Sequence, residues 1–488
     1  MSEELESNAR GRRVSPALVV ARREWVELLR DARWVALVGI VVALIVAALA
    51  VGIVERSRQT RERAAAAEGD RRVWTAQGPK NPHSAAHFGQ YAFKPIGLLA
   101  IADPGVDAYA GSAVYLEAHK QNEDRFRSAR DLGSMSRLAR LSFAFVLQIV
   151  LPLIAVILGH SAYSGERERG TLPLALGLGA DPRALFLGKA LAGASVLLGL
   201  LAIATAVLCL GIAIFLPEVE LEADFFARLA GLVPAYAIYI LGFFGLALAV
   251  SAAARGTRTA FVSLLVFWML NGFVAPRVAG DIASRLQPLP TGQAFRDGIA
   301  EAKRAQFGHD EKHPAFVAFR NRVLAEYGVD RVEDLPVSFR GLSLREDDHA
   351  GYRIFDEQFG RLRDLVARQD RLRSWAGFAF PLLALQPIST AMAGTDNAHH
   401  HEFIRSAELH RRRIQDAASA ELMEHGGVDG RAYVAPASLW EAIPSFSPTF
   451  PDARLAWRGR SLDFLRLGGW SACCWLAAWA ATIRPRAA

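Results

Sequence analysis

The chain has 488 residues and a formal net charge of +7, and 52% of its residues are hydrophobic. The apolar residues fall into long blocks separated by charged stretches, which is the profile of a membrane protein with large parts outside the membrane. The arginines are spread along the chain instead of forming one basic tract, which argues against nucleic-acid binding and favours contact with membrane lipid.

The N-terminal segment, residues 1–34, is expected to be a cytoplasmic leader followed by an interfacial amphipathic helix. Over residues 16–33, Leu18, Trp25 and Leu29 recur at helical spacing opposite charged residues. A tryptophan with flanking arginines suits a helix that lies at a membrane surface. A helix packed on a partner subunit explains the same pattern equally well, so both alternatives stay open.

Six apolar segments are long enough to cross about 30 Å of hydrocarbon as helices. They lie at residues 35–54, 141–159, 190–216, 229–250, 260–277 and 465–483. Arginines crowd before the first span, between the fourth and fifth, and after the last, whereas the connection at residues 217–228 is acidic. Short segments rich in basic residues stay in the cytoplasm, so both termini and residues 160–189 are predicted to be cytoplasmic.

Two polar regions, residues 55–137 and 278–462, then lie on the outer side of the membrane. The charged, alanine-rich start of the first, residues 56–72, is expected to prolong the first span as a helix. Helical periodicity marks three stretches of the second, at residues 316–327, 352–372 and 403–423. Because both regions are anchored to the same bundle, they are expected to pack together as one mostly helical extracytoplasmic domain.

One further apolar segment, residues 375–393, is nearly long enough to span. Counting it as a span would place the C-terminus outside and break the charge pattern. Pro381 and Pro387 interrupt it, and Gln386 is polar. The sequence therefore predicts a surface-lying or re-entrant segment, or the apolar core of the outer domain.

The loop between the second and third spans, residues 160–189, has a composition that a plain solvated turn does not explain. Charged residues open it, an apolar patch follows, and further basic residues close it, as suits a short helix on which a soluble partner docks. Its residues appear in the order Glu166, Glu168, Gly170-Thr171-Leu172, Pro182-Arg183 and Gly188-Lys189. This order resembles the cytoplasmic coupling segment of ABC-2-type ABC transporter permeases. The stretch at residues 391–413 resembles the branch of that family with a large uncharacterised extracytoplasmic domain.

The resemblance implies a polytopic, mainly α-helical permease subunit of the inner membrane, which exports its cargo and is not itself an enzyme. It implies a separate ATP-binding subunit that carries the ATP and Mg²⁺, and a second permease that is identical or related. This chain is then expected to bind no cofactor, and Gly188-Lys189 lacks the glycine and the hydroxyl of a phosphate-binding loop. The residues expected to couple to the ATPase are Glu166, Arg167, Glu168, Arg169, Gly170, Thr171 and Arg183.

Polar residues are sparse inside the predicted spans. The polar features are Gln148, Tyr236, Tyr239 and Asn271. An ion-coupled carrier usually places carboxylates or histidines along its path, so this set argues against one. Hydrogen bonds between helices are the expected role of these four side chains.

A histidine run at residues 399–401, followed by Glu402 and His410, offers candidate metal ligands. Adjacent residues of a helix point in different directions, so His399, His400 and His401 cannot all bind one ion. A polar turn that begins a helix is therefore the preferred interpretation, with no metal site expected. Outside the run, His309, His313 and His349 are scattered, and the three cysteines lie in apolar blocks without a zinc-ligand spacing.

Two alternatives to a transport subunit remain. A membrane-anchored receptor or assembly scaffold would bind a ligand through the outer domain and would have no ATPase partner. A metal-dependent enzyme of the outer domain would rest on the histidine run alone. The first is distinguished by whether an ATP-binding subunit associates with residues 160–189, and the second by stoichiometric metal in the purified protein.

Overall fold

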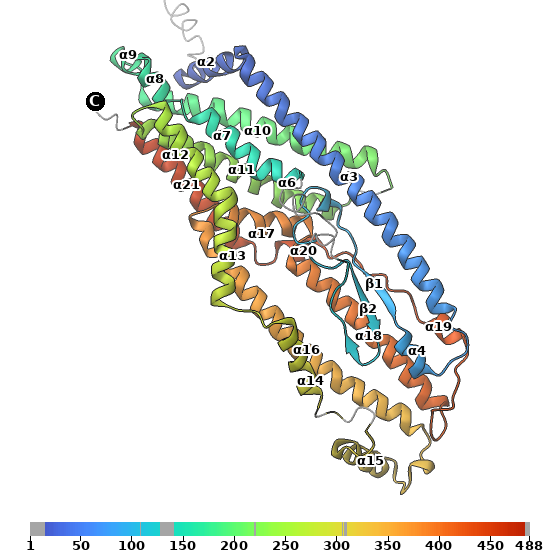
Figure 1. The fold of residues 1–488 in the computed structure, drawn as a ribbon. Coiled ribbons are helices and arrows are strands. Elements are labelled where there is room, and N and C mark those ends of the chain that lie inside the picture. The colour runs from blue at the N-terminus through green and yellow to red at the C-terminus, as the bar shows by residue number, and fades with distance from the viewer. Residues whose placement is uncertain are drawn as a thin grey trace, which may run out of the picture.

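The computed structural model describes residues 15–483 except 108, 127–140, 219–220, 305 and 307–309. The fold is an elongated, mainly helical molecule with a helical bundle at one end and the two polar regions at the other (Figure 1). The basic residues before position 15 and after position 483, on which the predicted orientation partly rests, lie outside the described residues, as does His309.

The helices of the first half are α2 (Pro16–Arg30), α3 (Ala32–Thr75), α4 (Pro82–Phe88), α6 (Phe143–Phe145), α7 (Leu151–Gly159), α8 (Ser164–Glu168), α9 (Thr171–Gly177), α10 (Pro182–Phe215) and α11 (Ala223–Ala253). The second half contains α12 (Thr257–Met269), α13 (Ala275–Leu286), α14 (Gly292–Lys303), α15 (Pro314–Tyr327), α16 (Phe339–Trp375), α17 (Leu382–Ala393), α18 (Asn397–His425), α19 (Ser438–Ala442), α20 (Ala453–Trp457) and α21 (Ser461–Ile483). Short helical turns are η1 (Leu98–Ile101), η3 (Val146–Val150), η4 (Leu270–Val274), η5 (Val332–Asp334) and η6 (Ala376–Phe378).

Within the described residues, five helical segments are long and apolar enough to cross a membrane. They are Ala32–Thr75, Phe143–Glu168, Pro182–Phe215, Ala223–Ala253 and Thr257–Leu286, and each overlaps one of the first five predicted spans. The sixth, residues 465–483, forms most of α21 and packs along α11, but its hydropathy does not reach the same standard. Its crossing of the membrane stays a prediction.

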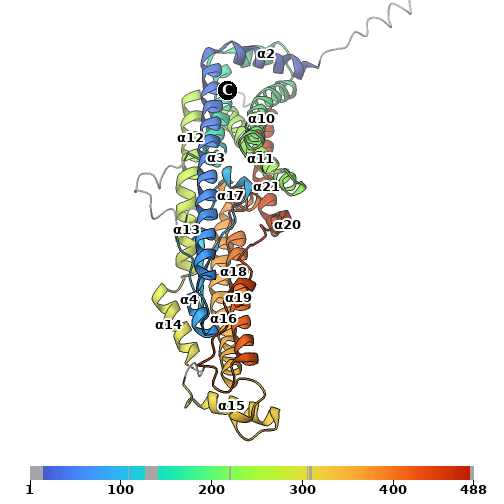
Figure 2. The same ribbon diagram turned by 90° about the vertical axis from the view of Figure 1, so that its right-hand side faces the viewer.

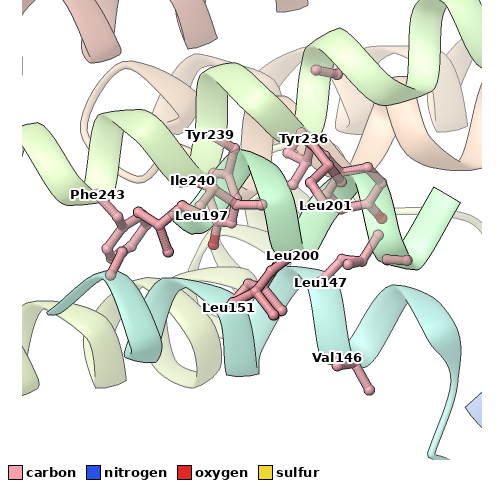
Figure 3. Close-up of a cluster of buried hydrophobic side chains, with 14 of the residues drawn as sticks. Val146, Leu147, Leu151, Leu197, Leu200, Leu201, Tyr236, Tyr239, Ile240 and Phe243 are labelled. Carbon is pink, nitrogen blue, oxygen red and sulfur yellow. The ribbon is translucent and has the colours of Figure 1, made fainter. Parts of the chain in front are cut away.

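Helix α11 lies at the centre of the bundle and packs against α7, α10 and α21. Figure 3 shows buried side chains of α7, α10 and α11 gathered in one cluster, among them Leu151, Leu200 and Phe243. Close approach depends on small residues, as is usual where helices pack in a membrane. A Cβ on Gly193 would lie 2.0 Å from Phe244, and one on Gly242 would lie 2.4 Å from Trp470.

Helix α3 continues far beyond the predicted span at residues 35–54. It is 44 residues long, which corresponds to about 66 Å at 1.5 Å per residue. Figure 2 shows it running from the bundle end along the polar regions without a break. The expectation that residues 56–72 prolong the first span as a helix is confirmed.

Two spans contain a π-helical turn, and in the second span a proline explains it. Pro152 has no N–H to donate, so the carbonyl of Gln148, four residues earlier, loses its usual partner. The hydroxyl of Tyr239 donates to that carbonyl instead, at 2.9 Å. The turn is η3, and a second π-helical turn, η4, precedes Pro276 in the fifth span.

The two polar regions pack together, which confirms that expectation. Trp74 at the end of α3 packs edge-to-face on Trp440 with ring centroids 6.1 Å apart, and its indole N–H donates to the Trp440 carbonyl. Both are fully buried in a core shared with Phe403 and Ile414 of α18. The three predicted helical stretches lie in α15, α16 and α18.

The first polar region also contains a small sheet that the sequence analysis did not predict. Strands β1 (Gln90–Phe93), β2 (Ala113–Glu117) and β3 (Lys120–Gln121) form an antiparallel sheet in that order. Its inner face packs on α18, where Val114 and Leu116 join the shared core. The two polar regions, which we call the outer domain after their predicted location, are therefore helical with a sheet on one side.

The apolar segment at residues 375–393 forms η6 and α17. Helix α17 lies across the end of the bundle, where it contacts α11 and α21 (Figure 1). Leu382, Leu385, Ile388 and Met392 are fully buried in the core of the bundle. Helix α17 is thus mostly buried between the bundle and the outer domain, and Pro387 lies inside the helix without ending it.

Candidate functional site

The predicted coupling segment forms two short helices, α8 and α9, at the end of the bundle opposite the outer domain (Figure 1). Helix α8 is held against the end of α11 by Ser251. The backbone N–H groups of Tyr163 and Ser164 donate to the Ser251 hydroxyl at 3.0 and 3.1 Å. All three residues are buried, so the first turn of α8 is fixed to the bundle.

A buried ion pair joins α8 to two other helices. The ammonium of Lys189 on α10 lies 2.9 Å from Glu166 of α8 and 2.6 Å from Glu24 of α2. The side chain of Lys189 is 4% exposed, and the ring of Tyr163 lies 5.7 Å from its nitrogen. One cation therefore holds α2, α8 and α10 together.

The next two charged residues of α8 reach the junction between α11 and α12. Arg167 donates to the carbonyls of Ala254 and Ala252 at 2.6 and 2.9 Å, where the last carbonyls of α11 lack helical partners. Glu168 accepts from the N–H and the hydroxyl of Thr257 at 2.8 and 2.9 Å, at the first residue of α12. Glu166, Arg167 and Glu168 thus contact α10, α11 and α12 directly, and Lys189 extends the connection to α2.

The remaining predicted coupling residues lie on the surface. Gly170 adopts a φ of 70°, in the left-handed region that favours glycine, and the chain turns there from α8 into α9. Arg169, Thr171 and Arg183 are exposed. The predicted coupling residues therefore fall into two groups. Glu166, Arg167 and Glu168 fasten the segment to neighbouring helices, whereas the others lie on its exposed surface.

Helix α9 presents apolar side chains that the sequence analysis did not single out. Leu174 is 63% exposed and Leu178, just after the helix, is 80% exposed. No residue of α9 is buried. An apolar helix at the tip of a bundle, next to a cluster of charges, is a surface suited to a protein partner.

Helix α2 lies beside this segment and packs on α10. A Cβ on Gly188 would lie 2.5 Å from Val20, and the indole of Trp25 donates to Ser195 at 2.8 Å. On the other side of α2, Leu29 is 76% exposed. Packing on α10 therefore explains one face of the amphipathic helix α2. That its other face lies at the membrane surface stays a prediction.

A polar network lies at the opposite end of the bundle, beneath α17. Gln148 donates to the hydroxyl of Tyr236 at 3.0 Å, and Asn271 donates to the hydroxyl of Tyr239 at 3.0 Å. Asn271 also accepts from the backbone N–H of Leu382 at 3.1 Å. The expectation that these four polar side chains form interhelical hydrogen bonds is confirmed.

The network extends to a buried carboxylate that sequence reasoning missed. Asp103 follows η1 and accepts from Ser389 of α17 at 2.5 Å, from Gln148 at 3.4 Å and from the N–H of Gly105 at 3.0 Å. The Ser389 hydroxyl lies 2.8 Å from that of Tyr236. Burial raises the pKa of Asp103, and the hydrogen bonds counteract part of that effect. The network therefore fastens the outer domain to the spans.

The histidine run begins α18, which confirms the predicted helix start. Asp396 caps the helix by accepting from the N–H of His399, and its carboxylate lies 2.6 Å from the same imidazole. His400 lies 3.4 Å from Asp124. His410 is buried and lies 3.4 Å from the amide of Gln90.

The imidazoles of the histidine run therefore have different partners and do not surround one point that could hold a metal ion. Burial and neighbouring cationic groups lower the pKa of His401 and of His410 to about 4. Of the other predicted candidates, His313 caps α15 and His349 lies 3.3 Å from Asp416. A different set, His83, His87 and His119, does converge among the described residues.

The described residues also line a cavity of about 830 Å³ beside the outer half of α3. Its wall is apolar in part, with Val51, Phe93 and Ile101, and charged in part, with Arg56 and Glu62.

Comparison with protein families gives two matches. A family model described as "ABC-2 family transporter protein" matches residues 18–313, from α2 to the segment after α14. A model described as "Domain of unknown function (DUF3526)" matches residues 294–449, which include α15 to α19 of the outer domain. No curated protein matches the chain.

Proposed function

Because this chain belongs to the ABC-2 family of transporter proteins, which supply the membrane-spanning subunits of ABC transporters, we propose that it is an export permease driven by a separate ATP-binding subunit. The ATP and Mg²⁺ would bind to that partner. The cytoplasmic placement of both termini and the extracytoplasmic placement of residues 55–137 and 278–462 belong to the same proposal, together with an inner-membrane location.

The observation that carries the proposal is the exposed apolar helix α9 on a rigidly held base. Leu174 and Leu178 offer an apolar surface to a partner, and Arg169 and Arg183 are exposed within the same segment. This base is held firmly, because Glu166, Arg167 and Glu168 tie α8 to α10, α11 and α12, and Lys189 in turn binds Glu24 of α2. A force applied to α9 would therefore reach four helices at once.

The mechanism follows from this connection. ATP binding would favour a closed pair of ATP-binding subunits, and a ligand shifts a two-state equilibrium by its preference for one state. The permease would follow as a rigid body gripped at α8 and α9. Within this chain, two sets of contacts would make the coupling segment and the spans move together. They are the ion pair of Lys189 and the hydrogen bonds from the backbone N–H groups of Tyr163 and Ser164 to Ser251.

A second permease subunit, identical or related, is part of the proposal. Among the five apolar segments, Ala32–Thr75 and Thr257–Leu286 have the smallest share of buried residues, whereas most residues of the spans around α7 and α11 are buried. Val51 and Val54 of α3 and Val262 and Val266 of α12 are more than half exposed. We propose that a second permease and lipid cover these faces.

The test is purification of the tagged full chain from its native membrane in mild detergent, with partners identified by mass spectrometry. We expect a stoichiometric ATP-binding subunit, which Leu174→Glu with Leu178→Glu removes. Val428→Glu, at an apolar position of the outer domain that is also more than half exposed, is the control and retains the partner. A preparation of the wild-type chain without an ATP-binding subunit would overturn the proposal and favour a receptor or scaffold.

A further inference from the structure

Helix α4 places two histidines of the first polar region on one face. His83 and His87 are four residues apart, and side chains at that spacing lie one above the other on a helix. Asn81 fixes the start of the helix, because its side chain accepts from the N–H of His83 at 3.1 Å and donates to the carbonyl of Gly430 at 2.9 Å. The pair is therefore held in place by the second polar region.

A third histidine reaches the pair from the turn between β2 and β3. Glu117 pairs with Lys120, so Ala118 and His119 form a two-residue turn, in which His119 has a φ of 58°. A non-glycine residue with positive φ is uncommon and marks a position that the surroundings enforce. The N–H of Ala118 donates to the carbonyl of Ala86 at 3.1 Å, which fastens the turn to α4.

The three imidazoles converge on one point. Each offers one ring nitrogen such that all three lie within 4.8 Å of one another. The ring centroids are 4.7 Å apart for His83 and His87, and 5.1 and 5.2 Å from these to His119. The Nε2 atoms of His83 and His87 are 3.3 Å apart. Two nitrogens bound to one tetrahedral Zn²⁺ at 2.0–2.1 Å are separated by about 3.3 Å.

A buried carboxylate orients the third ring. Asp348 of α16 is 5% exposed and lies 2.8 Å from Nδ1 of His119. A carboxylate only accepts, so Nδ1 of the neutral ring carries the proton and its Nε2 presents a lone pair. Metal-binding histidines are commonly oriented by a carboxylate in this way. Lys303 donates to the carbonyl of His119 at 2.7 Å and holds the backbone of the turn as well.

We propose that His83, His87 and His119 bind one divalent first-row metal ion of the Zn²⁺ class, with Asp348 as the orienting carboxylate. Three neutral imidazoles suit Zn²⁺, Cu²⁺ and Ni²⁺ and leave out Mg²⁺ and Ca²⁺, which prefer oxygen ligands. His87 is exposed, so the fourth position of a tetrahedral ion faces solvent and is open to water. The site is independent of the coupling segment and of the proposed transport function.

Such an ion would join parts of the chain that are distant in sequence. It would link α4 to the β2–β3 turn directly, and Asp348 would connect that turn to α16 of the second polar region. Ligand binding to the folded state alone raises stability by an amount that grows with the ligand concentration relative to Kd. The outer domain should therefore unfold at a higher temperature when Zn²⁺ is present.

The experiment uses the purified full chain in detergent, free of a polyhistidine tag and stripped of metal by a chelator. Zn²⁺ alone is titrated in, with calorimetry for affinity and elemental analysis for stoichiometry after dialysis. We expect one Zn²⁺ per chain and a rise in the unfolding temperature. His87→Ala changes an exposed residue and should weaken binding at least tenfold, and Asp348→Asn should weaken it by about 10- to 100-fold.

His425→Ala, an exposed histidine at the end of α18, is the matched control and should bind Zn²⁺ as the wild type does. Intense visible absorption on binding Co²⁺, lost in His87→Ala, would show the tetrahedral site by a second readout. The proposal is overturned if the wild type retains less than one Zn²⁺ per chain after dialysis. It is also overturned if His87→Ala and His425→Ala bind Zn²⁺ equally, because the three rings would then be joined by hydrogen bonds only.

Discussion

Lys189 lies 2.9 Å from Glu166, although the two residues are 23 positions apart in the sequence and lie on different helices. The same ammonium lies 2.6 Å from Glu24, and only 4% of the Lys189 side chain is exposed. This cation is the point at which the N-terminal helix, the loop segment and the third span meet.

Replacing Lys189 with methionine should therefore destabilise the protein. It leaves the carboxylates of Glu24 and Glu166 close together without a cation, and breaking a buried ion pair by removing one partner costs about 3 kcal/mol. Thermal unfolding in detergent measures the effect. Arg183→Met, at an exposed position of the same helix, is the control and should unfold near the wild-type temperature. Equal unfolding temperatures for the two variants would contradict the assigned role of Lys189.

A pair of glycines in the loop segment should respond oppositely to alanine. Nothing lies within 4 Å of a Cβ added at Gly170 or at Gly177, so neither substitution creates a clash. Gly170 has a φ of 70°, and alanine there should cost about 1 kcal/mol. Gly177 ends α9, where alanine should stabilise the helix by up to about 1 kcal/mol. Protease sensitivity of the segment in the full chain should rise for Gly170→Ala and fall for Gly177→Ala, and the reverse order would refute this prediction.

The outer domain should lose stability as the pH falls from about 6.5 to about 4. Burial, with His400 and Arg363 nearby, lowers the pKa of His401 from 6.5 to about 4, and burial near Arg413 does the same for His410. The unfolded chain therefore binds more protons than the folded chain in this window, so protonation favours unfolding. Unfolding temperatures measured across the window, with a chelator present, test the prediction.

The variant His410→Gln should show a shallower pH dependence, because glutamine remains neutral throughout. His425→Gln, at an exposed position of the same helix, is its control and should keep the wild-type slope. Parallel pH profiles for the two variants would show that His410 does not contribute.

Removing the carboxylate of Asp103 should loosen the contact between the outer domain and the spans. Asp103→Ala removes the buried acceptor that the hydroxyl of Ser389 and the amide of Gln148 share, at a cost of about 1–3 kcal/mol. Asp103→Asn keeps one acceptor oxygen and removes the buried charge, so it should cost less. Thermal unfolding compares these with Asp330→Ala, an exposed control. A wild-type unfolding temperature for Asp103→Ala would exclude the role of this network.

The sign of the Asp103 effect on pH dependence is opposite to that of the histidines. Its pKa is raised in the folded state, so its contribution to stability decreases as the pH rises above the usual carboxyl value of 3.8. Asp103→Asn should therefore lose less stability than the wild type between acidic and neutral pH. A wild-type profile for this variant would place the carboxyl in a more solvated environment.

The features that the sequence predicted well are those with strong local signals. Long apolar blocks located the helices of the bundle, and the alanine-rich repeat after residue 54 predicted the extension of α3 because alanine favours helix and no proline interrupts it. The interhelical hydrogen bonds of Gln148 and Asn271 followed from the cost of leaving a polar group unpaired among apolar helices.

The features that were missed depend on contacts between distant residues. Strands of four, five and two residues carry too little alternation to predict a sheet. Asp103 lies in the first polar region, where its local sequence does not mark it as buried, and its partners Gln148 and Ser389 are 45 and 286 positions away. The histidine run at residues 399–401 is visible in the sequence because its members are adjacent. His119, by contrast, lies beside His83 and His87 only because a tight turn between β2 and β3 brings it next to α4.

The unbroken helix α3 makes the two ends of the molecule mechanically dependent on each other. It contacts α2 and α10 at one end and is anchored at the other by Trp74. Over about 66 Å, a tilt of about 5° around the bundle end displaces the far end by about 6 Å. A rocking of the first span about the bundle end would therefore carry Trp74 and the core around it through a distance of that size.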